Sequence, residues 1–312
     1  MSPKVIICGA GFIGRAVARK LTSNSVKVAF SGRSPERSYE SLRASTPSEL
    51  LLPPIRADIT RPESLDAAFK DANLVVSLVG ILQGSRQDFE NIQWKGAANV
   101  ARAAKAAGAN LIHLSAIGAD ATSSIDYART KALGEAAVFQ EHSNATIIRP
   151  SLVFGPEDAL FNRFSLLSQF LPSLPAFGGG SSLFQPVYVE DIARLVSLLT
   201  LNPDAQKEFA GKVIEAGGPD VFAWKELMNL VLKFNGRRRL VLPLPFFVGK
   251  LMGAVLEQLP QSPLSLTRDQ VESLKTNNIV SPTAISLQRV LEKYEPGDSL
   301  GSVHHIVPTY MK

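Results

Sequence analysis

The chain has 312 residues, 45% of them hydrophobic and 20% charged, and its net charge is +5. This composition has no biased tract, so it predicts a folded globular protein and argues against disorder. The positive charge is too diffuse to indicate nucleic-acid binding, but it favours anionic partners such as phosphates or lipid head groups. The single cysteine, Cys8, excludes an intramolecular disulfide and a cysteine-built metal site. The histidines lack metal-ligand spacing, so no metal is expected.

Short β-branched runs alternate with helical segments in the first half of the chain. The expected strands are Lys4–Cys8, Val26–Phe30, Asn73–Val79, Asn110–Ser115 and Asn144–Arg149, with a weaker one at Pro54–Ala57 and a later one at Gln185–Val189. The expected helices are Phe12–Leu21, a helix opened by a capping box at Thr60–Glu63 and ending at Phe69, and Trp94–Ala107, which Gly108 closes. This repetition predicts an α/β protein with a Rossmann-type, doubly wound parallel sheet.

The texture changes after Arg149, where glycine and proline become frequent and apolar segments become short. We therefore expect residues 1–155 to form an NAD(P)-binding core. Residues 156–312 would form a smaller, mostly helical and loop-rich lobe that completes the cleft, with 185–193 returning to the core.

The motif Gly9-x-Gly11-x-x-Gly14 follows a predicted strand and opens a predicted helix, the context expected of a dinucleotide site. Gly9 permits a tight turn, Gly11 lets the backbone approach a pyrophosphate, and Gly14 allows close packing of helix on strand. The backbone N–H groups of Phe12 and Ile13, at the helix start, would face the phosphates.

Arg33 stands near the position where an NAD-preferring site carries a carboxylate for the ribose hydroxyl. A guanidinium pairs with a 2′-phosphate instead, so NADPH is expected over NADH, with a solvated surface arginine as the alternative. Asp58, with Ile59 beside it, would bind the adenine amino group, or else Asp58 bonds its own turn. Val79 and Gly80 end the fourth strand, and Gly80 would let the backbone lie close to the cofactor.

Tyr127 and Lys131 are spaced i, i+4, which places the phenol and the ammonium on one helix face. We expect the ammonium to lower the pKa of Tyr127 and make it a proton donor for carbonyl reduction. Lys131 would also bond the nicotinamide ribose, and Ser115 would bind the substrate oxygen. These three are the candidate catalytic residues.

Several segments together resemble the short-chain dehydrogenase/reductase superfamily in its extended-to-atypical branch. They are the glycine motif, Asp58, 113–119, Tyr127 with Lys131, 149–155, which contains the cofactor-site residue Pro150, and 187–193. Residues 155–164, 184–189, 242–247 and 266–271 are similar to the nucleotide-binding accessory subunits of respiratory complex I.

The resemblance implies a tightly held NADPH without turnover and other respiratory complex subunits as partners. It also implies a peripheral place on the matrix side of the mitochondrial inner membrane, beside the region where quinone enters. The intact Tyr127 and Lys131 leave a second function open, an NADPH-dependent reductase, epimerase or dehydratase acting on a small or isoprenoid substrate. No presequence is visible, because the first strand begins near Val5, so a cytoplasmic or bacterial membrane-associated protein stays open as well.

Contact with a membrane is a separate expectation. No stretch qualifies as a transmembrane helix, since the nearest, Leu242–Leu259, is interrupted by Lys250, Glu257 and prolines. However, three arginines at 237–239 precede an apolar segment that reaches Phe247. This segment either contacts anionic lipid or is a solvated loop leading into a buried helix.

Overall fold

The computed structural model describes residues 2–258 and 265–311. They divide into two compact units. The first runs to Pro150 and also contains Val189–Ala216 and Thr283–Asp298, and the second contains the described residues of Ser151–Tyr188, Gly217–Pro282 and the chain from Ser299 onward.

The first unit is built on an eight-stranded sheet in which every pair of neighbouring strands is parallel. In spatial order the strands are β14 (Ile285–Ser286), β11 (Val213–Ala216), β6 (Thr146–Pro150), β5 (Asn110–Leu114), β4 (Leu74–Ser77), β1 (Lys4–Cys8), β2 (Lys27–Gly32) and β3 (Ile55–Arg56). The six strands expected in the first 150 residues are all present. The two others, β11 and β14, come from later segments that the sequence analysis does not predict as strands.

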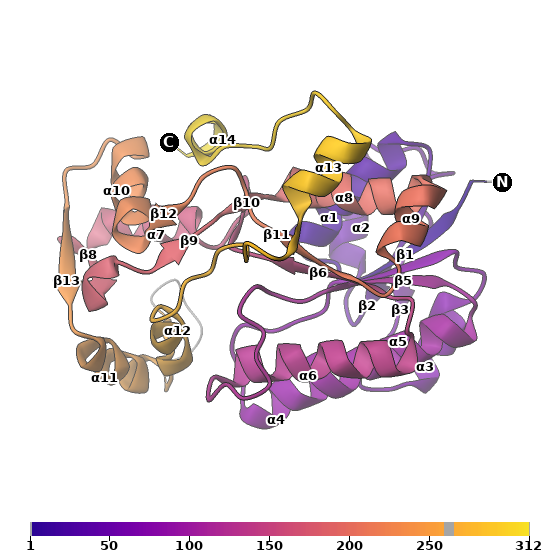
Figure 1. The fold of residues 1–312 in the computed structure, drawn as a ribbon, viewed down its shortest axis with the longest axis horizontal. Coiled ribbons are helices and arrows are strands. Elements are labelled where there is room, and N and C mark those ends of the chain that lie inside the picture. The colour runs from indigo at the N-terminus through magenta and orange to yellow at the C-terminus, as the bar shows by residue number, and fades with distance from the viewer. Residues whose placement is uncertain (1, 259–264, 312) are drawn as a thin grey trace. The chain divides into compact units, whose positions relative to one another are not determined.

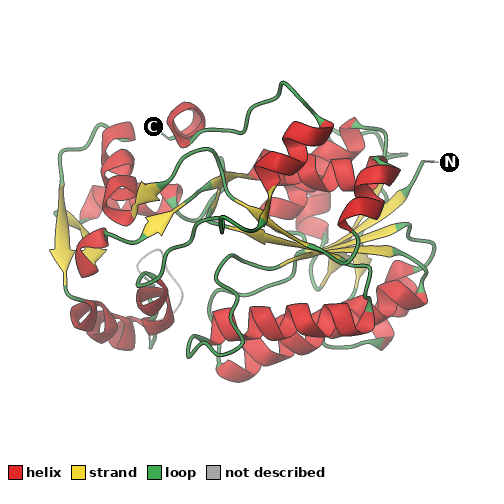
Figure 2. Ribbon diagram, viewed as in Figure 1, coloured by secondary structure: helices red, strands yellow, loops and turns green. Residues whose placement is uncertain are grey.

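Helices cover both faces of this sheet (Figure 2). They are α1 (Phe12–Ser23), α2 (Glu36–Arg43), α3 (Glu63–Phe69), α4 (Arg86–Phe89), the π-helix η1 (Glu90–Lys95), α5 (Gly96–Ala106), α6 (Asp126–Glu141), α8 (Val189–Leu201), α9 (Pro203–Phe209) and α13 (Leu287–Tyr294). Helices α3, α5 and α6 lie on one face, and α1, α8 and α13 lie on the other (Figure 1). This arrangement confirms the α/β Rossmann-type fold.

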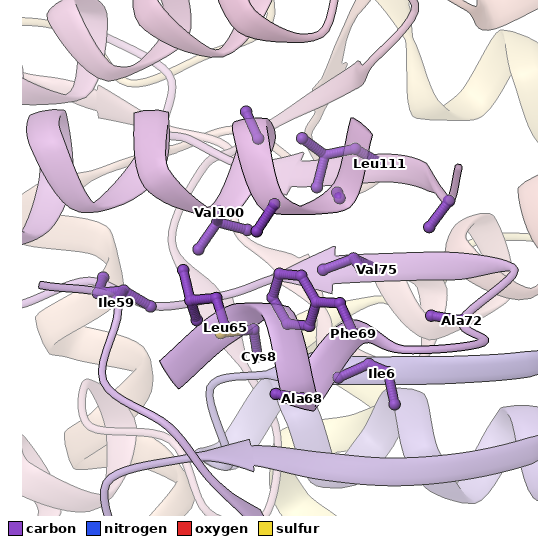
Figure 3. Packing of buried hydrophobic residues seen from close by; sticks show 14 of the residues in the cluster. Ile6, Cys8, Ile59, Leu65, Ala68, Phe69, Ala72, Val75, Val100 and Leu111 are labelled. Carbon is purple, nitrogen blue, oxygen red and sulfur yellow. The ribbon is translucent and has the colours of Figure 1, made fainter. Parts of the chain in front are cut away.

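The core between the sheet and α3 and α5 explains the continuous apolar runs of the strands. Val75 of β4 and Phe69 of α3 are almost completely buried there, together with Val100 of α5 (Figure 3). Cys8 lies in the same cluster, and burial raises the pKa of its thiol to about 12. Cys8 is therefore a small, protonated hydrophobe, as free cysteines usually are.

Two local predictions in this unit are wrong. Thr60 does not cap α3, because its hydroxyl and its N–H both bond Asp58 and the cap residue, Pro62, offers no side-chain hydrogen bond. The helix expected from Trp94 starts earlier, as α4 and then η1, before the α-helix α5 begins at Gly96. Apolar periodicity does not distinguish a π-helix from the α-helix that continues it.

The second unit contains three two-stranded sheets and several helices. Its elements are β7 (Val153–Phe154), α7 (Phe161–Phe170), β8 (Ser173–Phe177), η2 (Gly178–Gly180), β9 (Leu183–Phe184), β10 (Val187–Tyr188), β12 (Phe222–Ala223), α10 (Trp224–Phe234), β13 (Leu240–Leu244), α11 (Phe246–Leu256), α12 (Arg268–Ser273) and α14 (Val303–Tyr310). It has its own core, in which Phe154, Phe161 and Leu227 are fully buried.

Among the described residues no helix is long and apolar enough to cross a membrane. Of the residues predicted to interrupt the apolar stretch that starts at Leu242, Pro245 lies at the break between β13 and α11, whereas Lys250 lies within α11 and Glu257 follows its last residue. The end of that stretch, Leu259, lies outside the described residues.

Candidate functional site

The glycine motif forms the turn between β1 and α1, and each glycine has a different reason to lack a side chain. Gly9 adopts φ +115°, and a Cβ there would lie 3.0 Å from the carbonyl carbon of Leu78 and the nitrogen of Val79. A Cβ on Gly14 would lie 2.4 Å from the carbonyl oxygen of Gly9. A Cβ on Gly11 would meet nothing within 4 Å. Two glycines are thus required by packing, whereas Gly11 keeps a space open at the start of α1.

The first turn of α1 has the features of an anion-binding helix start. Its cap residue is Gly11, which offers no side chain to the free N–H groups, and the turn contains no acidic residue. Phe12 and Ile13 belong to this turn, and both are half-buried. Uncapped N–H groups at a helix start attract phosphate, so the space beside Gly11 fits the pyrophosphate of a dinucleotide.

Arg33 and Asp58 lie near each other beyond β2 and β3. Arg33 is exposed and directly follows β2. Burial raises the pKa of Asp58, but hydrogen bonds from Thr60 and the charges of Arg33 and Arg61 outweigh this, so the net shift is downward. One carboxylate oxygen of Asp58 accepts from the nitrogen and the hydroxyl of Thr60, at 2.9 and 2.8 Å. The local turn bonding considered for Asp58 is therefore present. Next to it, Ile59 is buried.

Lys131 reaches the end of the sheet from α6. Its side chain is 5% exposed, and its Nζ donates to the carbonyl oxygen of Leu114 at 2.9 Å. Burial lowers the pKa of Lys131 to about 8, against the opposing charge of Glu135. Glu135 is itself bound by Arg149 at 2.8 and 2.6 Å. Lys131 is therefore a buried cation anchored at the end of β5.

Gly80 brings the chain after β4 close to that cation. A Cβ on Gly80 would lie 3.3 Å from the Nζ of Lys131 and 3.3 Å from the Oε1 of Gln93. Gly80 is exposed, and Val79 before it is half-buried. The glycine expected to let a cofactor lie close to the backbone therefore stands beside the predicted ribose-binding lysine.

Gln93 is a polar residue of this site that the sequence analysis does not predict. It is 2% exposed and lies in η1. Its Nε2 donates to the hydroxyl of Thr130 at 2.9 Å, while its Oε1 has no hydrogen-bond partner. A buried acceptor without a partner is costly, so it indicates a missing donor. The sequence gives little sign of this role, because a single glutamine does not change the apolar periodicity from which buried positions are predicted.

Gly134 explains how Gln93 comes so close to α6. A Cβ on Gly134 would lie 2.2 Å from the carbonyl oxygen of Gln93, so any side chain there would push η1 and α6 apart. π-helical turns are frequent at functional sites because they redirect side chains within a helix. Here the π-helix and the glycine together place the Gln93 amide beside Thr130, one residue before Lys131.

Tyr127 and Ser115 complete the predicted group. Tyr127 lies in the first turn of α6, one turn before Lys131, and is half-buried. The expected lowering of its pKa by the ammonium is wrong, because burial raises the pKa of Tyr127 to about 12. Ser115 is 3% exposed, its backbone nitrogen bonds the Ile148 carbonyl at 2.7 Å, and its Oγ has no partner. Ser115 thus offers a second unsatisfied polar atom to a ligand.

Pro150 and His113 also lie at this end of the sheet. Pro150 ends β6 and is buried, and its carbonyl oxygen accepts from the nitrogen of Ile117 at 2.9 Å. His113 of β5 is 2% exposed, with Nδ1 3.2 Å from the hydroxyl of Ser77. Burial, together with the charge of Lys131, lowers the pKa of His113 to about 3. The imidazole is therefore neutral at working pH.

Every predicted site residue belongs to the first unit. The open space at Gly11 fits a phosphate group, whereas the unpartnered oxygens of Gln93 and Ser115 both lie near Lys131 and fit a polar group at that end of the site. In the described part of the chain, no group of three or more histidine, cysteine or acidic side chains is arranged to hold a metal ion.

The fold and this site define a Rossmann-type protein of the NAD(P)-binding class. Comparison with known proteins gives the family. The model of the NAD dependent epimerase/dehydratase family matches residues 5–217, and the chain belongs to that family. These proteins are the extended branch of the short-chain dehydrogenases and reductases, in agreement with the predicted resemblance.

The chain is also homologous to a respiratory subunit. It is 32% identical over 288 residues to the Arabidopsis thaliana mitochondrial NADH dehydrogenase [ubiquinone] 1 alpha subcomplex subunit 9, covering 89% of this chain and 71% of that protein. The Dictyostelium discoideum subunit of the same name is 26% identical, with coverage of 94% and 85%. A ceramide reductase of Caulobacter vibrioides is 27% identical over 244 residues, with coverage of 77% and 73%.

Solved structures show the same fold at low identity. The Citrobacter triphenylmethane reductase, complexed with NADP(H), matches with a TM-score of 0.73 at 18% identity over 98% of this chain and 99% of that one. A dTDP-glucose 4,6-dehydratase of Streptomyces venezuelae, solved with NAD, matches with a TM-score of 0.71 at 15% identity over 99% and 95%. Because one holds NADP(H) and the other NAD, the fold alone does not assign the nucleotide.

Proposed function

We propose that this chain is an NADPH-holding accessory subunit of a mitochondrial-type respiratory complex I, near the quinone site on the matrix side of the inner membrane. The main support for this proposal is the extent of the match to the two respiratory subunits, which covers 89% and 94% of the chain. This likeness goes beyond residues 5–217, the part that family enzymes of many activities share. The partners would be other subunits of the complex.

The preference for NADPH rests on Arg33. The last two residues of β2 and the two that follow read Ser31-Gly32-Arg33-Ser34, and they offer no carboxylate for a ribose 2′-hydroxyl. Arg33 is exposed, so its guanidinium is available to a 2′-phosphate. Its charge helps to lower the pKa of Asp58, which places it near the residue expected to bind the adenine. The bound nucleotide would then be NADPH, with its pyrophosphate at Gly11.

The absence of turnover is supported by Tyr127. With its pKa raised to about 12, the phenol gives up its proton less readily than an ordinary tyrosine. General acid catalysis works best when the pKa lies near the working pH. The direction of this shift favours a site that holds its cofactor over one that transfers a proton from Tyr127.

The second candidate is an NADPH-dependent reductase, epimerase or dehydratase acting on a small or isoprenoid, quinone-related substrate. Two observations favour it: Ser115, Tyr127 and Lys131 are all present, and the Ser115 hydroxyl has no partner. The relation to a protein named ceramide reductase adds a reductase to the relatives.

The subunit proposal also includes peripheral contact with anionic membrane lipid through residues 237–247. Membership in a complex is tested by tagging the full chain in its host and solubilising the membranes gently. A native gel is then stained for NADH dehydrogenase activity and probed for the tag. We expect the tag in the active high-mass band, whereas migration of the whole population as a free chain would contradict the proposal.

A further inference from the structure

Helix α11 of the second unit turns its small residues inward. Gly249 and Gly253 are both buried. A Cβ on Gly249 would lie 2.8 Å from side-chain atoms of Phe177 and Val271, and one on Gly253 would lie 2.9 Å from the nitrogen of Arg268. The inner face of α11 therefore lies so close to its neighbours that it has no room for large side chains.

The large apolar residues of α11 lie on its outer face instead. Phe247, Leu251 and Val255 are 70%, 68% and 61% exposed, and their i, i+4, i+8 spacing makes one stripe along the helix. Met252, at 39%, widens it. A soluble helix normally turns such a stripe toward its core, so a stripe facing outward indicates a surface that something else covers.

The stripe carries no charge of its own. The single charged side chain of α11 is Lys250, whose ammonium is bound by Glu272 of α12 at 2.6 Å. The hydrogen bond from Lys250, with that from Lys275, holds the pKa of Glu272 below its usual value, so the pair stays ionised and compensated. The outer face is thus apolar for the length of the helix.

A basic segment leads directly into this face. Strand β13 runs into α11 (Figure 1), and Leu240 and Leu242 on β13 are 73% and 44% exposed. Arg237, Arg238 and Arg239 immediately precede β13, and the last two are exposed. Residues 237–255 therefore combine a cationic start with an apolar surface, which we call the α11 face.

We propose that the α11 face is a docking surface for an anionic bilayer, with the stripe in the head-group boundary and the arginines at lipid phosphates. Charge complementarity decides the occupant: arginines beside an uncharged apolar face match a negatively charged membrane surface. A symmetric second copy would cover the apolar stripe but would bring more arginines and no anionic partner for them, whereas lipid phosphates supply that partner. An eleven-residue helix is about 16 Å long, too short to span a bilayer but suited to lying in its plane.

This inference rests on the membrane-side location in the proposed function, and it deepens that location by naming the helix that makes the contact. Unlike complex membership, it is testable with the purified full chain. Because Cys8 is fully buried, a cysteine introduced on the surface takes a thiol-reactive dye selectively. The probe is Leu251→Cys carrying an environment-sensitive dye, and the matched control is Leu201→Cys on α8, where Leu201 is 43% exposed.

The probes are titrated with vesicles of phosphatidylcholine alone and with vesicles of phosphatidylcholine mixed with phosphatidylserine, which gives them a negative surface potential. We expect a blue shift at position 251 with the anionic vesicles, none at 201, and loss of the shift as salt rises. Arg238→Glu with Arg239→Glu should weaken binding at least ~25-fold, since each cation near the surface contributes about fivefold.

Three results would overturn the inference: no shift at 251, equal shifts at 251 and 201, or equal binding to neutral vesicles. Concentration-dependent self-association without vesicles, abolished by Leu251→Glu, would assign the α11 face to a second copy instead. If the tag enters the complex but position 251 ignores vesicles, the face binds a protein subunit, so this inference fails while the proposed function stands. If position 251 responds to anionic vesicles but the tag stays outside the complex, the proposed function fails while this inference stands.

Discussion

Gly11 and Gly14 stand three residues apart but respond differently to an added methyl group. At Gly11 the methyl meets nothing in the protein, so Gly11→Ala should keep the stability of the unliganded chain while blocking the phosphate. At Gly14 it would lie 2.4 Å from a backbone oxygen, so Gly14→Ala should destabilise the fold by ~2 kcal/mol or more. Urea unfolding and nucleotide titration of both variants measure this. Undiminished binding by Gly11→Ala would remove the pyrophosphate from this turn.

Arg33 tests the choice of nucleotide. Arg33→Asp removes the partner of a 2′-phosphate and supplies an acceptor for a ribose hydroxyl, so NADPH should bind roughly 10- to 100-fold more weakly, with NADH unchanged or tighter. Arg43→Asp makes the same charge change on an exposed arginine of α2 and serves as the control. Calorimetric titration with both nucleotides gives the ratio. A constant NADPH to NADH ratio in Arg33→Asp would refute the assignment.

Lys131 links the site to pH. Its fall in pKa from 10.5 to about 8 corresponds to roughly 3 kcal/mol of destabilisation while the buried group is charged. Between pH 8 and 10.5 the unfolded chain binds a proton that the folded chain has released, so this residue's contribution makes the unliganded fold more stable as pH rises. Lys131→Met should therefore stabilise the unliganded chain by ~2 kcal/mol at pH 7, after the lost bond to Leu114.

That advantage of Lys131→Met should shrink as pH rises toward 10.5, while nucleotide binding is weakened throughout. Urea unfolding at pH 7 and pH 9.5 compares the variant with the parent. A variant less stable than the parent at pH 7 would mean that the ammonium is not under the penalty inferred from its burial.

Among the elements that build the site, the π-helix η1 is the least expected from the sequence, and its role can be tested through Gln93. Gln93→Leu removes the amide that bonds Thr130 and faces Gly80. Gln93 lies beside Gly80, which follows β4, whereas Arg33 follows β2, two strands away in the sheet. NADPH and NADH should therefore weaken by a similar factor, about tenfold. Gln93→Glu should restore part of the binding and shift its pH profile through the neighbouring lysine. A loss confined to NADPH would contradict this placement.

The sequence predicts the site elements unevenly, for physical reasons. Buried parallel strands are continuous apolar runs, so β1, β4 and β5 are found with nearly correct ends. Strand β14 has two residues, too few for a pattern, and its pairing with β11 depends on contacts between distant parts of the chain. The Thr60 prediction fails because Asp58 competes for the same hydroxyl. The lowered pKa expected for Tyr127 is wrong because the i, i+4 spacing shows that the phenol is near Lys131 but does not show how deeply the phenol is buried.

In the whole molecule, the two units support different parts of the proposed function. The first contains all the predicted nucleotide contacts, which any family member needs whether or not it reacts the nucleotide. The second contains the α11 face, and the respiratory subunits match through much of it as well as the core. The two proposals, that the first unit holds NADPH and that the second docks on a membrane, therefore together describe a subunit better than either proposal alone.

The most direct test of this account uses the chain purified in its native state, with its nucleotide still bound. One portion is denatured and the released nucleotide is identified by mass, while another is incubated with quinone and carbonyl compounds and followed at the absorbance of reduced nicotinamide. The account predicts about one NADPH per chain that stays reduced throughout. An empty site that binds NADPH reversibly and oxidises it, with the rate lost in Tyr127→Phe, would contradict it and make the protein a reductase.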